Sequence, residues 1–204
     1  MKSRSQATGQ KERKVRLTFH PVTKERWKDF ERLFGDKGAC GGCWCMWWRL
    51  AKRQFDAQKG AENKKFMKAI IDAGEIPGLL AYDAGEAVAW CSVAPREVFP
   101  RLDNAPTLKR VDDRPVWSVV CFYIAPSYRR AGVSGQLLKA AIAHVKKRGG
   151  KIVEGYPFEV KKGAKPLPGA FVYAGLVPAF RKAGFKVALR RSSSRPIMRY
   201  YIGK

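Results

Sequence analysis

The most informative segment of the chain is Ile124-Ala125-Pro126-Ser127-Tyr128-Arg129-Arg130-Ala131-Gly132-Val133-Ser134-Gly135. It follows an apolar run, Trp117 to Ile124, that is typical of a strand, and it leads into an amphipathic pattern that is typical of a helix. The apolar residues of that pattern recur at the spacing of one buried helix face: Val133, Leu137, Leu138, Ala141, Ile142 and Val145. The sequence therefore predicts a strand, a short basic turn and a helix in direct succession.

The predicted turn has the features of a phosphate-binding site. The free N–H groups of a first helical turn and the positive end of the helix dipole are directed at one place. Arg129 and Arg130 add positive charge, while Gly132 and Gly135 let the backbone approach a ligand closely. The turn matches neither a Walker loop nor a Rossmann fingerprint. On these residues alone, a phosphate site and an ordinary surface connection are both open interpretations.

Length and composition indicate one domain behind a short tail. The chain has 204 residues, of which 46% are hydrophobic, so it can bury a sizeable core. Residues 1–14 are polar and basic without periodicity, and we expect a disordered tail followed by a single domain over residues 15–204. No apolar run approaches the ~18 residues of a membrane span, and the first residues lack the apolar core of a signal peptide. We expect no membrane partner.

Cysteine use and charge narrow the class of protein further. The sequence has 5 cysteines and no export signal, which favours reduced thiols in a cytoplasmic protein over a disulfide framework. Lys and Arg number 41 against 17 acidic residues, a net charge of +24. Such a field favours anionic partners, including nucleic acid and the phosphates of a nucleotide cofactor. Because the positive residues form no single stripe, a strongly basic solvated surface is favoured over nucleic-acid binding as the main function.

Other segments read as alternating helices and strands. Further strands are predicted at 15–20, 78–82, 87–93, 152–156, 185–190 and 197–202. Further helices are predicted at 23–34, 46–55, 63–73 and 171–182. The Pro-containing connection 95–115 is expected to be exposed and partly helical, and 158–169 to be a basic loop.

Two motifs in this order resemble the GCN5-related N-acetyltransferase (GNAT) superfamily. Arg-x-x-Gly-x-Ser after an "apolar-x-Pro" strand end is similar to the family's acyl-CoA pyrophosphate loop, with Ser134 where the family usually has Gly or Ala. Lys182-Ala183-Gly184-Phe185 looks like the second signature, "Lys-x-Gly-Phe". The resemblance implies an α/β (α+β) fold, with a mixed central sheet of about six to seven strands, splayed strands 4 and 5, and flanking helices.

The resemblance also implies a donor and a mechanism. Acetyl-CoA would pair its pantetheine arm with the strand 116–124, and its pyrophosphate would lie on the N–H groups of the turn. The implied donor-binding residues are Phe122, Ile124, Arg129, Arg130, Ala131, Gly132, Val133, Ser134 and Gly135. The N–H of Phe122 would polarise the thioester carbonyl while a neutral amine attacks it directly.

The catalytic side chains are less well defined. Many family members protonate the departing thiolate with a Tyr at the position that Phe180 holds here, and Phe180 has no proton to give. Tyr173 is a possible substitute. Glu154 as general base and Tyr156 as proton donor or acceptor contact are the leading candidates, since both lie at the end of a predicted strand. The alternative for both is an ordinary solvated or hydrogen-bonded strand-end residue.

A second distinctive patch runs from Cys40 to Arg49, with the sequence Cys-Gly-Gly-Cys-Trp-Cys-Met-Trp-Trp-Arg. It resembles a bacterial GNAT subfamily that carries Cys-Trp-Cys-Met followed by aromatics and Arg. Three interpretations are open: a wall of the acceptor pocket, a three-thiolate metal site, or buried core. The candidate acceptor-binding residues are Cys43, Trp44, Trp47 and Arg49. A zinc site would need a fourth ligand that the spacing does not supply, so no metal is expected.

These patterns together predict a cytoplasmic enzyme that transfers an acetyl group from acetyl-CoA to a primary amine. Two rivals come from other classes: a non-catalytic acyl-CoA-binding sensor, which the missing Tyr favours, and a nucleic-acid-associated basic protein. The sequence identifies neither the amine nor the oligomeric state, and both a monomer and a homodimer are compatible with it.

Overall fold

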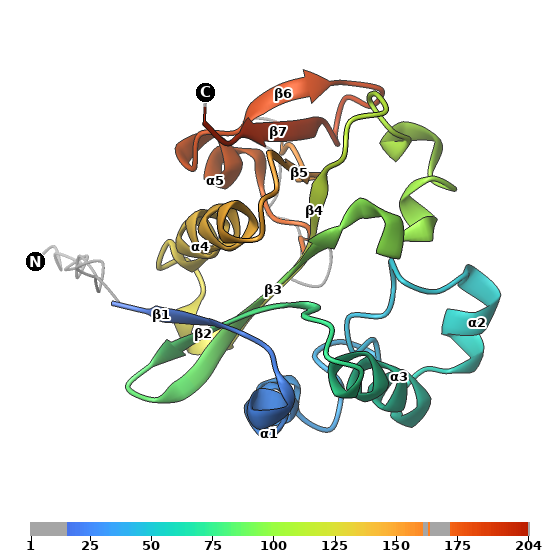
Figure 1. The fold of residues 1–204 in the computed structure, drawn as a ribbon, viewed down its shortest axis with the longest axis vertical. Helices are drawn as coiled ribbons and strands as arrows, with labels where there is room; N and C mark the ends of the chain where they lie inside the picture. The colour runs from blue at the N-terminus through green and yellow to red at the C-terminus, as the bar shows by residue number, and fades with distance from the viewer. Residues whose placement is uncertain (1–15, 161–162, 164–171, 204) are drawn as a thin grey trace, which may run out of the picture.

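A computed structural model describes residues 16–160, 163 and 172–203 of the chain. Its centre is a 7-stranded sheet with the order β1-β2-β3-β4-β5-β7-β6 (Figure 1). The strands are β1 (Thr18–Pro21), β2 (Gly78–Asp83), β3 (Glu86–Pro95), β4 (Trp117–Ile124), β5 (Ile152–Gly155), β6 (Lys186–Leu189) and β7 (Ile197–Tyr201). The predicted tail, residues 1–14, lies outside the described residues.

The sheet is mixed, because β4 and β5 are parallel and all other neighbours are antiparallel. The parallel pairing is short, from Trp117 opposite Val153 to Val119 opposite Gly155. β4 continues to Ile124 after β5 has ended at Gly155, so the second half of β4 is not paired with β5. The expected fold class, with strands 4 and 5 splayed, is confirmed.

A bulge changes which residues of β4 share a face. The register with β3 shifts between Ser92 and Val93, which lie opposite Cys121 and Val119, so Val120 is the extra residue. Val119 and Phe122 therefore belong to the core under one face of the sheet, and Cys121 packs on the other.

Helices cover both faces of the sheet (Figure 1). α4 (Val133–Lys147) and α5 (Val177–Lys182) pack on one face, in a core that includes Leu79, Ala81 and Cys91. α1 (Trp27–Phe34), α2 (Lys52–Ala57) and α3 (Ala61–Asp72) share the other core with Leu80 and Trp90. In the part of the chain that is described, no helix is both long and apolar enough to cross a membrane.

A third core lies beneath the connection between β3 and β4. Three short 3-10 helices, η2 (Arg96–Val98), η3 (Pro100–Leu102) and η4 (Pro106–Leu108), form this connection. Phe99, Leu102 and Leu108 are buried against Val120 of β4 and Ile197 of β7. The expectation that 95–115 is partly helical is confirmed, and the expectation that it is exposed holds only in part, because Phe99, Leu102 and Leu108 are buried in this core.

Two predicted helices are shorter than expected. Instead of a helix over 46–55, the chain makes one turn, breaks at Ala51 with extended ψ of 151°, and then starts α2. Met46 packs under α1 and α3 and Trp48 packs in the third core, both within the single turn that precedes the break. α5 begins only at Val177, after Gly175 at φ 81°, and residue 171 of the predicted helix lies outside the described part.

Candidate active site

The turn between β4 and α4 presents backbone toward open space. η5 (Pro126–Tyr128) leads into Arg130 and Gly132, whose φ angles of 63° and 72° are left-handed, and Gly132 is the N-cap of α4. At Gly132 and Gly135, no described atom lies within 4 Å of the position that a Cβ would take. α4 is 15 residues long, and its first N–H groups are directed into this space. The turn thus has the shape and polarity that suit a bound phosphate group.

Two groups of the predicted donor site are occupied by the chain itself. The N–H of Gly135 donates to the Gly132 carbonyl at 3.1 Å, so the expectation that this N–H is available to a pyrophosphate is corrected. Gly135 instead contributes the open space above the helix. Nε of Arg129 donates to the carbonyl of Ile124 at 2.9 Å, on the edge of β4 where a pantetheine arm is expected. A ligand on this edge would have to displace the Arg129 side chain.

The edge of β4 beyond β5 is covered by residues 172–176. The N–H of Phe122 donates to the carbonyl of Tyr173 at 2.6 Å, and the N–H of Phe158 donates to the carbonyl of Gly175 at 2.9 Å. The N–H of Val177 returns to the carbonyl of Phe158 at 3.0 Å. The first of these bonds reaches β4 and the other two join the segment to Phe158, so the Tyr173 carbonyl satisfies the N–H that the resemblance assigns to the oxyanion.

Phe180 fills the base of the splay. Its ring is fully buried and meets the rings of Phe122 and Phe185 edge-on, with centroid distances of 6.2 and 5.0 Å. A Cβ on Gly155 would come within 2.2 Å of the Phe180 ring, so the glycine at the end of β5 is required by this packing. Phe180 is a core residue, and it has no proton to donate.

A cavity of about 530 Å³ opens beside the exposed half of β4. Aromatic rings and thiols form most of its wall. The described residues that line it are Phe34, Ala39, Cys40, Gly41, Cys43, Cys45, Trp47, Trp48, Phe55, Lys59, Cys121, Phe122, Tyr123, Arg129 and Tyr173. Phe122 belongs both to this wall and to the strand edge just described, so the cavity meets the splay at that residue.

The structure divides the four acceptor-binding candidates. Cys43 and Trp47 line the cavity. Trp44 does not; it is 2% exposed and stacks on Trp27 and Phe34, with centroid distances of 6.3 and 5.7 Å. Arg49 does not either, because its guanidinium lies 5.0 Å from the centre of the Phe99 ring. The placement expected for Trp44 and Arg49 is therefore corrected: both pack behind the cavity wall.

Three of the cavity thiols interact with one another. Trp90 donates its indole N–H to Sγ of Cys45 at 3.2 Å. A hydrogen bond from Cys121, followed by that from Trp90, lowers the pKa of Cys45, whereas burial raises the pKa of Cys43 to about 11. Among the described residues, no group of three His, Cys, Asp or Glu side chains is arranged to hold a metal ion. The thiols form a soft, weakly polar part of the wall.

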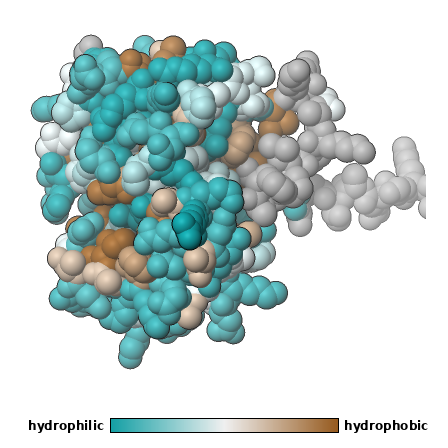
Figure 2. Space-filling view, turned by 90° about the vertical axis from the view of Figure 1, so that its right-hand side faces the viewer, coloured by the Kyte–Doolittle hydropathy of each residue, from teal (hydrophilic) through white to brown (hydrophobic). Residues whose placement is uncertain are grey.

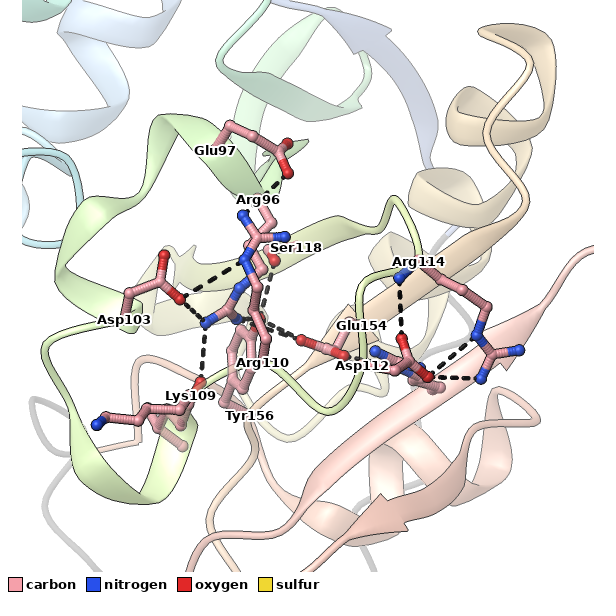
Figure 3. A network of polar contacts seen from close by, with 12 residues as sticks. Arg96, Glu97, Asp103, Lys109, Arg110, Asp112, Arg114, Ser118, Glu154 and Tyr156 are labelled. Carbon is pink, nitrogen blue, oxygen red and sulfur yellow. Dashed lines mark hydrogen bonds and ion pairs between the residues drawn. The ribbon is translucent and has the colours of Figure 1, made fainter.

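Glu154 and Tyr156 lie in a buried polar network and not in the cavity (Figure 3). Glu154 is fully buried; its Oε1 accepts from the Tyr156 hydroxyl at 2.7 Å and from Nη1 of Arg96 at 3.3 Å, and its Oε2 accepts from Nε of Arg199 at 2.6 Å. The Tyr156 hydroxyl also accepts from Nη1 of Arg96 at 2.6 Å and lies 2.9 Å from Oγ of Ser118. Burial, then the charge of Glu154, raises the pKa of Tyr156 well above its usual value.

The network extends from these residues to the surface of the β3–β4 connection. Nη2 of Arg96 donates to Asp103 at 2.6 Å, and Nη1 of Arg199 donates to Asp112 at 2.7 Å. Glu154 thus neutralises two buried arginines and has no open path to an incoming amine. The expectation that Glu154 and Tyr156 face the cleft is corrected, since their partners turn them toward the third core.

Several wall residues carry no distinctive sequence signal. Cys121 and Tyr123 share one face of β4, a pattern that core packing also explains. Phe55 and Lys59 gave no signal, because they reach the wall only through the break at Ala51. Tyr173 was noted as a possible proton donor, and the structure places it both in the cavity wall and against Phe122.

Comparison with known families agrees with this architecture. A model of the acetyltransferase (GNAT) family matches residues 44–158, which is more than half of the chain. The chain therefore belongs to the GNAT acetyltransferase family. The matched residues include β4, the glycine-containing turn, β5 and part of the cavity wall. No curated protein matches the sequence.

Solved structures share the fold at low sequence identity. A GNAT acetyltransferase from Listeria monocytogenes superimposes with a TM-score of 0.56 at 8% identity, over 91% of this chain and 95% of that one. The PaiA N-acetyltransferase of Thermoplasma acidophilum, in complex with coenzyme A, gives 0.52 at 14%, over 92% and 99%. The yncA protein of Salmonella typhimurium, with its cofactor acetyl-CoA, gives 0.50 at 12%, over 92% and 95%. At these identities the similarity concerns the fold alone.

Proposed function

We propose that the protein transfers an acetyl group from acetyl-CoA to a primary amine, which attacks the thioester directly. The observation that carries the proposal is that the cavity meets the splay of β4 and β5 at Phe122. The splayed edge of β4 can take the thioester, and the cavity can take the amine. The family match and the coenzyme A bound to the Thermoplasma protein support acetyl-CoA as the donor.

In this proposal the turn holds the donor by its phosphates. The N–H groups of residues 131–134 bind the pyrophosphate at the N-terminus of α4, and Arg129 and Arg130 add charge. The pantetheine arm replaces Tyr173 at the edge of β4. The thioester carbonyl then accepts the N–H of Phe122 in place of the Tyr173 carbonyl. This N–H stabilises the negative oxygen of the tetrahedral intermediate.

The proton steps are assigned to Tyr173 and water. The amine nitrogen bonds to the carbonyl carbon, the C–S bond breaks, and the thiolate takes a proton. Burial raises the pKa of Tyr173, so its hydroxyl is protonated at neutral pH and can supply that proton. The described lining includes no carboxylate, so the amine gives up its proton to water. Glu154 and Tyr156 have no part in these steps.

Donor binding tests the proposal through a matched pair of variants on α4. Gly135→Leu fills the open space above the turn without requiring a left-handed backbone, and Ala143→Leu adds a similar side chain at an exposed position farther along the same helix. We expect Gly135→Leu to weaken acetyl-CoA binding at least tenfold in calorimetry and Ala143→Leu to leave it unchanged. Equal affinity in both variants would remove the donor site from this turn.

A non-catalytic acyl-CoA sensor is the second candidate, and the buried Phe180 in place of the usual acid favours it. Tyr173→Phe separates the two functions. For an enzyme it should lower kcat at least tenfold, leave acetyl-CoA affinity within twofold, and remove a basic limb from the pH profile of kcat. For a sensor, acetyl-CoA binds tightly and no amine releases CoA. A nucleic-acid role would show instead as an affinity for DNA or RNA that falls steeply with salt.

A further inference from the structure

We propose that the acceptor is an amine with an aromatic or bulky apolar body and an acidic group, and with no second cationic group. The inference rests on the proposed function, because it concerns the amine side of the same site. It is drawn from the chemistry of the cavity wall: rings, thiols and two cations.

The rings of the wall define the body of the acceptor. Trp47 and Phe55 meet edge-on with a centroid distance of 5.0 Å, and Trp48 meets Trp47 at 6.5 Å. Arg101 fixes this corner from behind, with its guanidinium 3.7 Å from the centre of the Trp47 ring and Nη1 donating to the Trp47 carbonyl at 3.0 Å. Tyr123 closes the wall on the strand side. Such a wall gains most from a ring or a branched apolar group.

The charges of the wall define the polar group of the acceptor. Lys59 and Arg129 are the charged residues among the described lining, and both are positive. Lys59 is only partly neutralised, because its partner Asp56, at 3.5 Å, also binds Lys52 at 2.5 Å and so serves two cations. Because Arg129 also serves the donor phosphates, Lys59 is the wall cation that remains for the acceptor, and a carboxylate or phosphate on the acceptor fits it. A second ammonium or guanidinium would enter without a counter-charge.

The field of the whole protein acts in the same direction. The net charge of +24 repels polycations and attracts anions. Figure 2, which views the molecule from the side of α2 and the β3–β4 connection, shows hydrophobic residues gathered within an otherwise mostly hydrophilic face. An amphiphilic anion fits such a surface better than a polyamine or a basic peptide.

The same charges help the chemistry. A bound ammonium beside Lys59 and Arg129, in a wall that is mostly apolar, loses its proton more easily than it does in water, because burial and like charge both disfavour the charged form. A neutral amine is the form that attacks a thioester. The site therefore needs no carboxylate base, in agreement with the described lining, which has none.

Three amines with matched features test the proposal. L-Phenylalanine has the ring and the acid, its amide keeps the ring without the acid, and agmatine has a second cation and no ring. We expect kcat/KM for CoA release to fall at least tenfold from the first to the second and again to agmatine. Calorimetry of each amine with the CoA-bound protein gives affinity in the same order, whether or not turnover occurs.

Charge reversal at the wall supplies the control. Lys59→Glu should narrow or reverse the preference for L-phenylalanine over agmatine, and Lys146→Glu, the same charge change at an exposed position on α4, should leave it unaltered. Preference for agmatine by the wild type, no binding of L-phenylalanine, or equal effects of the two variants would overturn the acceptor class. Loss of acetyl-CoA binding or of CoA release alone, with the amine affinities in the expected order, would overturn the proposed function and not the acceptor class.

Discussion

Two neighbourhoods lie on the same side of β4 and differ in almost every respect. Along its first half, where β5 is paired to it, Ser118 contacts the filled ionic network around Glu154. Along its second half, where β5 has left, Cys121 and Tyr123 border an apolar cavity. Under the proposed function, a ligand enters where strand pairing ends and not where polar side chains are most abundant. The residues that look most catalytic, a buried Glu–Tyr–Arg group, belong to the structural half.

The greatest loss of stability should come from disrupting the ionic network around Glu154. Glu154→Leu leaves Arg96 and Arg199 buried without their shared carboxylate, and it should lower the free energy of unfolding by about 3–5 kcal/mol. Urea denaturation measures this loss. Glu97→Gln, which removes an exposed partner of Arg110 at 3.1 Å, should cost less than about 1 kcal/mol. A Glu154 variant of wild-type stability and reduced acetyl transfer would return Glu154 to the catalytic machinery.

The next largest loss of stability is expected at Gly155, where the pairing of β5 with β4 ends. Gly155→Ala places a Cβ against the Phe180 ring, so we expect a loss of about 1–3 kcal/mol in unfolding free energy from overpacking. Adding Phe180→Leu should recover part of this loss, because the ring is what the new methyl group meets. If the double variant is as unstable as the sum of the two single variants, the contact is not the cause.

The cavity half should tolerate substitution better. Cys45→Ala removes the acceptor of the buried Trp90 indole N–H, and we expect a cost of about 1–2 kcal/mol. Cys43→Ala, in the same wall, should cost less, because Cys43 is only partly buried and accepts no indole N–H. Equal losses in chemical denaturation would show that the Trp90 hydrogen bond contributes little.

A smaller effect is expected on how the melting temperature depends on pH in the acid range. Hydrogen bonds from Arg199 and then Arg114 lower the pKa of Asp112 below its usual value. A lowered folded-state pKa stabilises the fold above the unfolded-state pKa of about 3.9, and this stabilisation is lost as the pH falls below it. The melting temperature should therefore drop below about pH 4, and Asp112→Asn should reduce that slope. Arg114→Gln should reduce it less, because Arg199 holds the carboxylate from the buried side.

The contrast between the two halves also explains what the sequence could predict. The turn and α4 follow from local patterns: Gly132 must take a left-handed angle, and the apolar spacing starts at the next residue. Glu154 was misplaced because its partners are 58 and 45 residues away, at Arg96 and Arg199. The residues around Glu154 in the sequence do not indicate that its carboxylate is neutralised by distant arginines. Trp44 was misplaced for a related reason, since its side chain direction follows from a left-handed backbone at φ 45° that composition does not predict.

The hydrogen bond from Phe122 to the Tyr173 carbonyl has a consequence for the order of events. Because Tyr173 both covers the strand edge and lines the cavity, a thioester that displaces it also reshapes the amine side. We therefore expect sequential kinetics in which the donor binds first and the acceptor second. After transfer, the acetyl carbonyl belongs to the amide product, so the returning Tyr173 carbonyl competes with that product for the same N–H and assists its release.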